Sequence, residues 1–182
     1  MEWRNTNERY GLLSIGLHWL MLLQLVAVYA CIDLREFFPK GSDLREALKF
    51  WHFSLGLSVF LVVWIRLVAH ITGPVPRVVP ASPAWQSVPG KLVHVVLYGL
   101  MIALPVLGWL ILSAEGKAIP FFGWQLPALV AEDKGLADWS KVLHETGGTI
   151  GYFVIGLHAL AALFHHYVQR DNTLRRMLPT RP

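Results

Sequence analysis

The chain has 182 residues, of which 54% are hydrophobic and only 15% are charged. This composition excludes a disordered chain and is too apolar for an ordinary soluble domain. The net charge is +4, but the basic residues lie at segment ends rather than along one face, which argues against nucleic-acid binding. A single cysteine, Cys31, excludes an intrachain disulfide and a cysteine-rich metal site. The eight histidines therefore carry the expected site chemistry.

Four apolar segments are long enough to cross a bilayer as helices, which takes about 20 residues. In chain order they are 10–32, 50–71, 92–114 and 146–169. Only the second contains a Lys, Arg, Asp or Glu, namely Arg66, whose long side chain we expect to reach the headgroups. The first exceeds the apolar region of a signal peptide, roughly 7 to 15 residues, so we expect it to remain as an anchor.

The other apolar stretch, 118–131, contains Pro120, Gly123 and Pro127 and is too short to span. We expect an interfacial loop or a short re-entrant turn there. The proline-rich segment Gly73 to Pro89 is expected to be an extended connection. The sequence thus predicts one domain over residues 1–182, an all-α membrane protein built as a four-helix transmembrane bundle.

The charges between the spans predict the orientation of the bundle. The termini and the second loop, with Arg66, carry nine basic residues against three acidic ones, whereas the first and third loops carry seven basic and nine acidic residues. The positive-inside rule then places both termini in the cytoplasm. The nine basic residues are Arg4, Arg9, Arg66, Arg77, Lys91, Arg170, Arg175, Arg176 and Arg181.

Histidines occur on all four predicted helices, and their depths fall into two pairs. At 1.5 Å per residue, His18 lies roughly 12 Å into the first helix and His158 roughly 17 Å before the end of the last, so their depths are similar. His52 and His144 are expected to open their helices near the outer surface. His144 and His158 are about four turns apart on one helix face, a separation of about 21 Å.

Two opposed imidazoles at two levels favour axial ligation of two b-type haems stacked across the membrane. Zinc fits less well, because it takes about four converging ligands and acids are absent from the spans. A small residue follows each outer ligand by one turn, Gly56 after His52 and Gly148 after His144, which leaves a gap for a flat macrocycle. A hydrogen-bonding role across the bundle is the alternative for each single histidine.

The remaining histidines are weaker candidates. His94 lies two residues into the third predicted span, which is too shallow to match His158. His70, His165 and His166 lie near the cytoplasmic interface, where solvated or quinone-contacting roles compete and a structural role is the simpler interpretation.

Several segments resemble the bacterial cytochrome b561 family over nearly the whole chain. The most specific is LHETGGTIGYFVIGLHALAALFHHY, residues 143–167, with the following DNTLRRMLP, residues 171–179. The others are IGLHWLMLL (15–23), LREFFPK (34–40), HFSLGLS (52–58) and IALPVLG (102–108). The resemblance implies an inner-membrane cytochrome with two b haems held by His18, His52, His144 and His158. It also implies electron transfer from superoxide to ubiquinone, as in members that act as superoxide oxidases.

If superoxide is the donor, cations at the outer side raise the local concentration of this anion. The candidates are Arg35, Lys40, Lys49 and Lys141, for which pairing with propionates or acidic residues is the alternative. Ser14, His165 and His166 are candidate quinone contacts, and interfacial histidines are suited to relay protons. The expected partners are superoxide, a membrane quinone and the lipid bilayer, without nucleic acid or an obligatory protein.

Two other functions remain open on the sequence. One is a haem-b membrane subunit that relays electrons between quinone and a separate dehydrogenase or hydrogenase. The other is a non-redox transporter or sensor that uses its histidines for protons or metal and shows no haem spectrum.

Overall fold

The computed structural model describes residues 2–179. Its long helices are α1 (Leu12–Leu34), α2 (Asp43–Ile71), α3 (Ala84–Ala114) and α4 (Lys134–Phe164). The short elements are the helical turns η1 (Arg35–Phe37), η2 (His165–Gln169) and η3 (Arg175–Met177) and the strands β1 (Ile119–Phe121) and β2 (Trp124–Leu126). Within the described residues, four helices are long and apolar enough to span a membrane. This finding confirms the predicted helical membrane fold.

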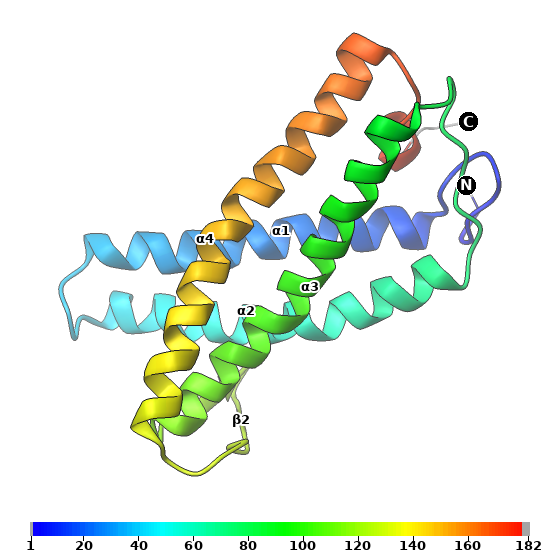
Figure 1. The fold of residues 1–182 in the computed structure, drawn as a ribbon. Coiled ribbons are helices and arrows are strands. Elements are labelled where there is room, and N and C mark those ends of the chain that lie inside the picture. The colour runs from blue at the N-terminus through cyan, green and yellow to red at the C-terminus, as the bar shows by residue number, and fades with distance from the viewer. Residues whose placement is uncertain (1, 180–182) are drawn as a thin grey trace.

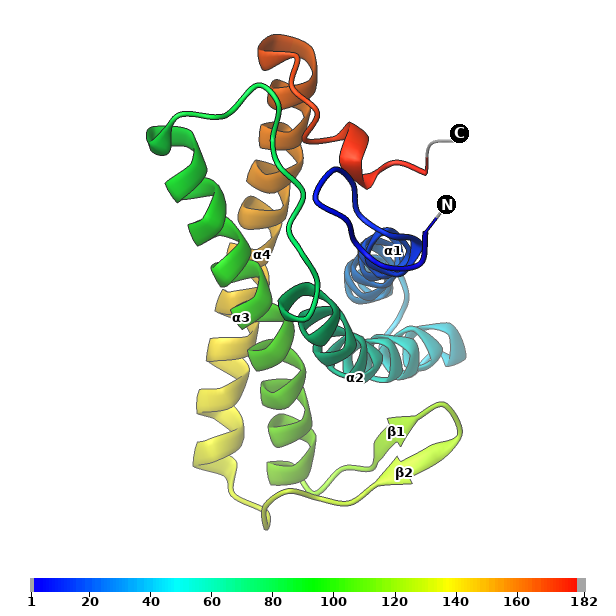
Figure 2. The same ribbon diagram turned by 90° about the vertical axis from the view of Figure 1, so that its right-hand side faces the viewer.

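The long helices form two antiparallel pairs that cross one another (Figure 1). α1 packs beside α2, α3 packs beside α4, and contacts between α2 and α3 join the two pairs. The side view shows α1 nearly end-on and α2 obliquely, while α3 and α4 run lengthwise (Figure 2). We call the end with the α1–α2 and α3–α4 connections the hairpin end, and the end with both termini the terminal end.

Three helices begin earlier than the apolar runs predict. α2 begins at Asp43 rather than 50, α3 at Ala84 rather than 92, and α4 at Lys134 rather than 146. For α2 and α4 the reason is local: the side chains of Ser42 and Asp133 accept hydrogen bonds from backbone N–H groups of their first turns. Polar first turns therefore remain helical beyond the apolar core, and His52 and His144 lie inside their helices instead of opening them.

Large apolar side chains face outward along the helices, as they do in a bundle that is surrounded by lipid. Phe153 is 75% exposed, and Leu23 is 65% exposed. Buried contacts are concentrated in two small clusters, one around Met21, Val59 and Val63 and one around Leu57, Leu112 and Ile119. The crossing of the helix pairs thus leaves a thin core with space between the pairs.

The segment 118–131 does not form a spanning helix, as predicted. It contains the hairpin of β1 and β2, paired antiparallel with Ile119 opposite Leu126. The turn between the strands includes Gly123 at φ +89°, a conformation that favours glycine. Ile119 is buried against α2 and α3, so the β1–β2 hairpin covers one side of the bundle at the hairpin end.

Backbone and side-chain hydrogen bonds join three segments at the terminal end. Trp19 on α1 donates its Nε1–H to the carbonyl of Met177 at 2.7 Å. Asn172 bonds to both backbone polar groups of Val79, at 3.1 Å and 2.9 Å. The connection is non-helical only from Thr72 to Pro83, so the predicted extended segment ends earlier than Pro89. Arg181, counted above in the charge balance, lies outside the described residues.

Candidate functional site

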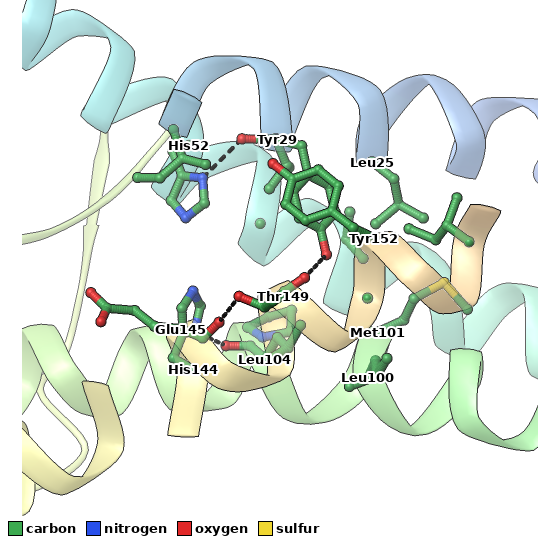
Figure 3. A pocket seen from close by; sticks show the side chains of 18 of the residues that line it. Leu25, Tyr29, His52, Leu100, Met101, Leu104, His144, Glu145, Thr149 and Tyr152 are labelled. Atoms are coloured by element: carbon green, nitrogen blue, oxygen red, sulfur yellow. Dashed lines mark hydrogen bonds between the residues drawn. The ribbon is translucent and has the colours of Figure 1, made fainter. Parts of the chain in front are cut away.

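The imidazoles of His52 on α2 and His144 on α4 face each other across a cavity at the hairpin end. Their ring centroids are 6.2 Å apart and their planes are inclined by 74°. The cavity has a volume of about 290 Å³ and is lined largely by apolar side chains of α1, α2, α3 and α4. Figure 3 shows the two rings with one nitrogen of each directed toward the other.

Backbone carbonyls fix the protonation of both rings. His52 Nδ1 lies 3.0 Å from the carbonyl oxygen of Val28, and His144 Nδ1 lies 2.9 Å from that of Leu104. Because a carbonyl only accepts, each Nδ1 must donate, which leaves the Nε2 lone pair of a neutral imidazole free to bind a metal. An Nδ1–H held by a carbonyl is the arrangement that orients histidine ligands in metalloproteins.

The spacing of the rings fits one metal between them. An imidazole nitrogen binds a first-row metal at about 2.0–2.1 Å, so two opposed rings that share one metal have centroids about 6.3–6.5 Å apart. The observed 6.2 Å is close to this range. In the part of the chain that the structure describes, no group of three or more His, Cys, Asp or Glu gathers to hold a metal, which disfavours a tetrahedral zinc site.

Glycines give this cavity its shape. A Cβ added to Gly56 or to Gly148 meets no atom within 4 Å, and both residues line the cavity. By contrast, a Cβ at Gly147 would lie 2.7 Å from the Leu104 side chain, and one at Gly151 would collide with the Tyr29 hydroxyl. Gly56 and Gly148 thus leave the open gap that the sequence predicts, while Gly147 and Gly151 allow helix contacts.

A second pair, His18 on α1 and His158 on α4, lies toward the terminal end. Its ring centroids are also 6.2 Å apart, with the planes inclined by 66°. These rings line a cavity of about 180 Å³ together with His94 and Arg66. The spacing again fits a single metal between opposed imidazoles, so both predicted pairs come together in the fold.

Two expectations about the terminal-end pair are wrong. Because α3 begins at Ala84, His94 lies deep enough for its ring centroid to come within 5.1 Å of that of His158. This distance is too short for a metal between opposed rings. Arg66 does not reach outward: it bonds to His18 Nδ1 at 2.9 Å and donates to the Tyr98 hydroxyl at 3.1 Å. Neutral partners inside the bundle hold it there.

Comparisons with known proteins identify the family of the chain. A profile of the prokaryotic cytochrome b561 family matches residues 9–180. The chain belongs to this family. It is 40% identical over 174 residues to cytochrome b561 homolog 1 of Escherichia coli K12, which covers 96% of this chain and 99% of that protein. It is 39% identical over 173 residues to the probable superoxide oxidase CybB of Yersinia pestis, which covers 95% and 97%.

A third relative, cytochrome b561 homolog 2 of Escherichia coli K12, is 30% identical over 186 residues and covers 98% of this chain and 95% of that protein. Membership in the prokaryotic cytochrome b561 family means membrane electron transfer with b-type haem. Together with the four spans, it identifies a multi-pass bacterial membrane protein. The donor set described above, imidazoles in opposed pairs, is the one that b-type haem takes.

The predicted outer cations of this cytochrome b561 lie at the hairpin end, and three of them are paired with acids. Arg35 contacts Glu36 at 2.9 Å, Lys49 contacts Glu46 at 2.7 Å and Lys141 contacts Glu145 at 3.9 Å. Lys40 is exposed, and none of the ion pairs of residues 2–179 includes it. These pairs weaken the local positive potential.

Sequence reasoning missed Arg45, which is buried at the hairpin end. Its guanidinium donates to the carbonyls of Arg35 and Phe38 at 2.8 Å and 2.9 Å and to Glu36 at 3.2 Å. It therefore holds the α1–α2 connection. A basic residue three positions after the helix-capping Ser42 gave no sequence signal of this role.

The candidate quinone contacts lie in different surroundings. Ser14 lines the terminal-end cavity and donates to Asn5 Oδ1 at 2.7 Å. His165 and His166 are not among the described residues that line it. His165 Nδ1 is 2.5 Å from Asp171 Oδ2. Burial raises the pKa of Asp171, but hydrogen bonds from His165 and Thr173 outweigh burial and hold this pKa below its usual value.

Proposed function

We propose that this cytochrome b561 holds two b haems, one between His52 and His144 and one between His18 and His158, and passes electrons from superoxide to ubiquinone. Held by these two histidine pairs, the haems would supply one-electron redox chemistry. Two superoxide anions then yield two dioxygen molecules for each quinone that takes up two protons to form quinol.

The observation that carries the proposal is the pair of Nδ1–carbonyl hydrogen bonds of His52 and His144. A histidine that merely bridges helices has no need of an Nε2 lone pair directed at a second imidazole. Here two helices supply such lone pairs across one cavity, at a spacing of 6.2 Å. The cavity walls beside them are opened by Gly56 and Gly148.

Superoxide as donor is supported by a relative named a probable superoxide oxidase and by the cations of the hairpin end. Lys40 attracts an anion most directly, since Arg35, Lys49 and Lys141 share their charge with acids. At the terminal end, Ser14 is proposed to contact quinone, and His165 and His166 to contact it or relay protons. The positive-inside rule supports a cytoplasmic location of this end, and we propose that the protein lies in the inner membrane.

The first experiment is a reduced-minus-oxidised spectrum of the purified protein with haem quantitation, followed by superoxide consumption with added ubiquinone. We expect two b haems per chain and quinol formation without another protein. A colourless protein, or haem that superoxide leaves oxidised, contradicts the proposal. Quinone reduction that requires an added dehydrogenase or hydrogenase would support the relay subunit instead.

The role of the cations is tested by the variants Lys40→Gln and Arg35→Gln/Lys141→Gln, with Lys91→Gln at the terminal end as control. At low ionic strength, we expect superoxide-driven haem reduction to slow about 2- to 10-fold in the hairpin-end variants. The difference should vanish at high salt, because exposed charges are then screened. An unchanged rate and salt dependence with full haem content would exclude electrostatic attraction by these residues.

A further inference from the structure

The described wall of the terminal-end cavity contains two arginine side chains and no carboxylate to balance them. Arg66 and Arg176 both line it, with His18, His94 and His158. No aspartate or glutamate is among the described residues of its wall. By contrast, Asp33 and Glu145 line the hairpin-end cavity. The positive charge of the terminal-end cavity therefore has no counterpart within the wall.

Among the described residues, the groups that hold Arg66 are neutral. It bonds to His18 Nδ1 and to the Tyr98 hydroxyl, and its guanidinium lies 5.9 Å from the centroid of the Tyr98 ring. A charged residue inside a membrane span is costly and normally pairs with an opposite charge or faces a functional cavity. Arg66 faces such a cavity and lacks such a charge, so an anionic group would lower its cost.

Arg176 provides an independent sign of a missing partner. One of its terminal nitrogens donates to the carbonyl of Pro76, and its guanidinium lies over the Tyr10 ring. Its Nε is buried and has no hydrogen-bond partner within residues 2–179. A buried donor without an acceptor is destabilising, so this nitrogen is expected to have an acceptor in the loaded protein.

The hydrogen bond between Arg66 and His18 cannot persist when His18 binds a metal through Nε2 as a neutral imidazole. Arginine only donates, so His18 Nδ1 accepts here and its proton is on Nε2. Ligation through Nε2 moves that proton to Nδ1. The resulting N–H group cannot accept a hydrogen bond from arginine. Arg66 must therefore release His18 and find a different acceptor.

We infer that Arg66 and Arg176 bind the propionate carboxylates of the haem held by His18 and His158. This inference rests on the proposed function. A planar guanidinium matches a carboxylate through two parallel hydrogen bonds. Two arginines on one cavity wall match the two carboxylates of one haem. In the absence of the carboxylates, Arg66 bonds to the very histidine that it would release on loading.

The test compares Arg66→Met and Arg176→Met with Arg66→Lys and with the control Arg175→Met, an exposed neighbour on η3. Losing one charge-assisted hydrogen bond is expected to weaken retention of the terminal-end haem roughly 10- to 100-fold. Arg66→Lys should recover part of the loss, since it keeps the charge but not the planar fork. The hairpin-end haem should stay bound in every variant, which reports that the chain is folded.

Redox titration provides a second readout. Removing a cation beside a haem disfavours the reduced form, so the midpoint potential of the terminal-end haem should fall in both Met variants. Each tenfold change in the ratio of affinities for the two redox states corresponds to about 59 mV for one electron. The hairpin-end potential should change less, because it is farther from both arginines.

Haem with esterified propionates tests whether the propionate carboxylates are the groups that the arginines bind. Apoprotein from cells blocked in haem synthesis is loaded with haem b or with its dimethyl ester, in the His52→Ala background that leaves only the terminal-end site. We expect the ester to bind roughly 10- to 100-fold more weakly than haem, and this difference to shrink in Arg66→Met/Arg176→Met. Equal binding of haem and ester, with unchanged potentials in the Met variants, overturns the inference alone. An unaltered chain that binds no haem overturns the proposed function as well.

Discussion

The hairpin-end and terminal-end histidine pairs have the same spacing but are held by different groups. Both pairs have ring centroids 6.2 Å apart. At the hairpin end, each Nδ1 faces a backbone carbonyl, whereas at the terminal end the Nδ1 of His18 faces Arg66. The helix backbone therefore already directs the Nε2 lone pairs of the first pair toward a metal. In the second pair, His18 can do so only when Arg66 moves away.

The charges around the two pairs differ in sign as well. Asp33 and Glu145 line the hairpin-end cavity, and Arg66 and Arg176 line the terminal-end cavity. Negative groups favour an oxidised iron, and positive groups favour a reduced one. This arrangement favours electron movement from the hairpin end to the terminal end, the direction that the proposed function requires.

Replacing a ligand tests the two pairs most strongly. We expect His52→Ala to remove the hairpin-end haem and His158→Ala to remove the terminal-end haem, each leaving about one haem per chain, because axial imidazoles hold b-type haem. His166→Ala is the matched control and should keep both. Haem-to-protein ratios after purification check this outcome, and a full complement of haem in either ligand variant would refute the pairing.

Filling a glycine gap should affect only the hairpin end. Gly148→Leu places a side chain in the open space of that cavity, and overpacking of this kind costs about 1–3 kcal/mol. We therefore expect weaker haem binding there, while the helix itself is favoured by leucine over glycine. Gly90→Leu, at an exposed site of α3 outside the cavity, is the control. Equal haem affinity in the two variants would contradict the role of the gap.

The smallest effect is expected from the tail beneath the terminal-end pair. Asp171 is 4% exposed, and its lowered pKa means that its bonds to His165 and Thr173 stabilise the folded tail fully above pH about 3.9. This contribution is lost only as pH falls through the lower folded pKa. Asp171→Asn should cost about 1 kcal/mol between pH 5 and 7. Hydrogen exchange of the tail measures this cost, and equal protection in both proteins would exclude it.

The sequence predicts the parts of this fold that depend on composition and depth. Four spans, the opposed histidine pairs and the glycines beside the hairpin-end pair all follow from helix geometry and the cost of polar groups in lipid. The helix starts do not follow, because Ser42 and Asp133 extend helices beyond the apolar runs that the prediction counts.

The sequence pattern also does not predict the side-chain directions in the terminal-end cavity. The apolar run begins at Leu92, so the sequence places His94 too shallow, and it predicts that Arg66 reaches the headgroups. Its inward direction depends on His18 and Tyr98, which lie on other helices. Such a choice depends on tertiary partners that are far away in the sequence.

The crossing of the two helix pairs has a consequence for how the protein matures. His18 and His52 belong to the first pair, and His144 and His158 belong to the second. Each bound haem would therefore be held by one histidine from each helix pair, and neither pair could retain haem by itself. Delivery of the cofactor is then the event that locks the inserted halves together, so pigment supply should control the abundance of the assembled protein in the cell.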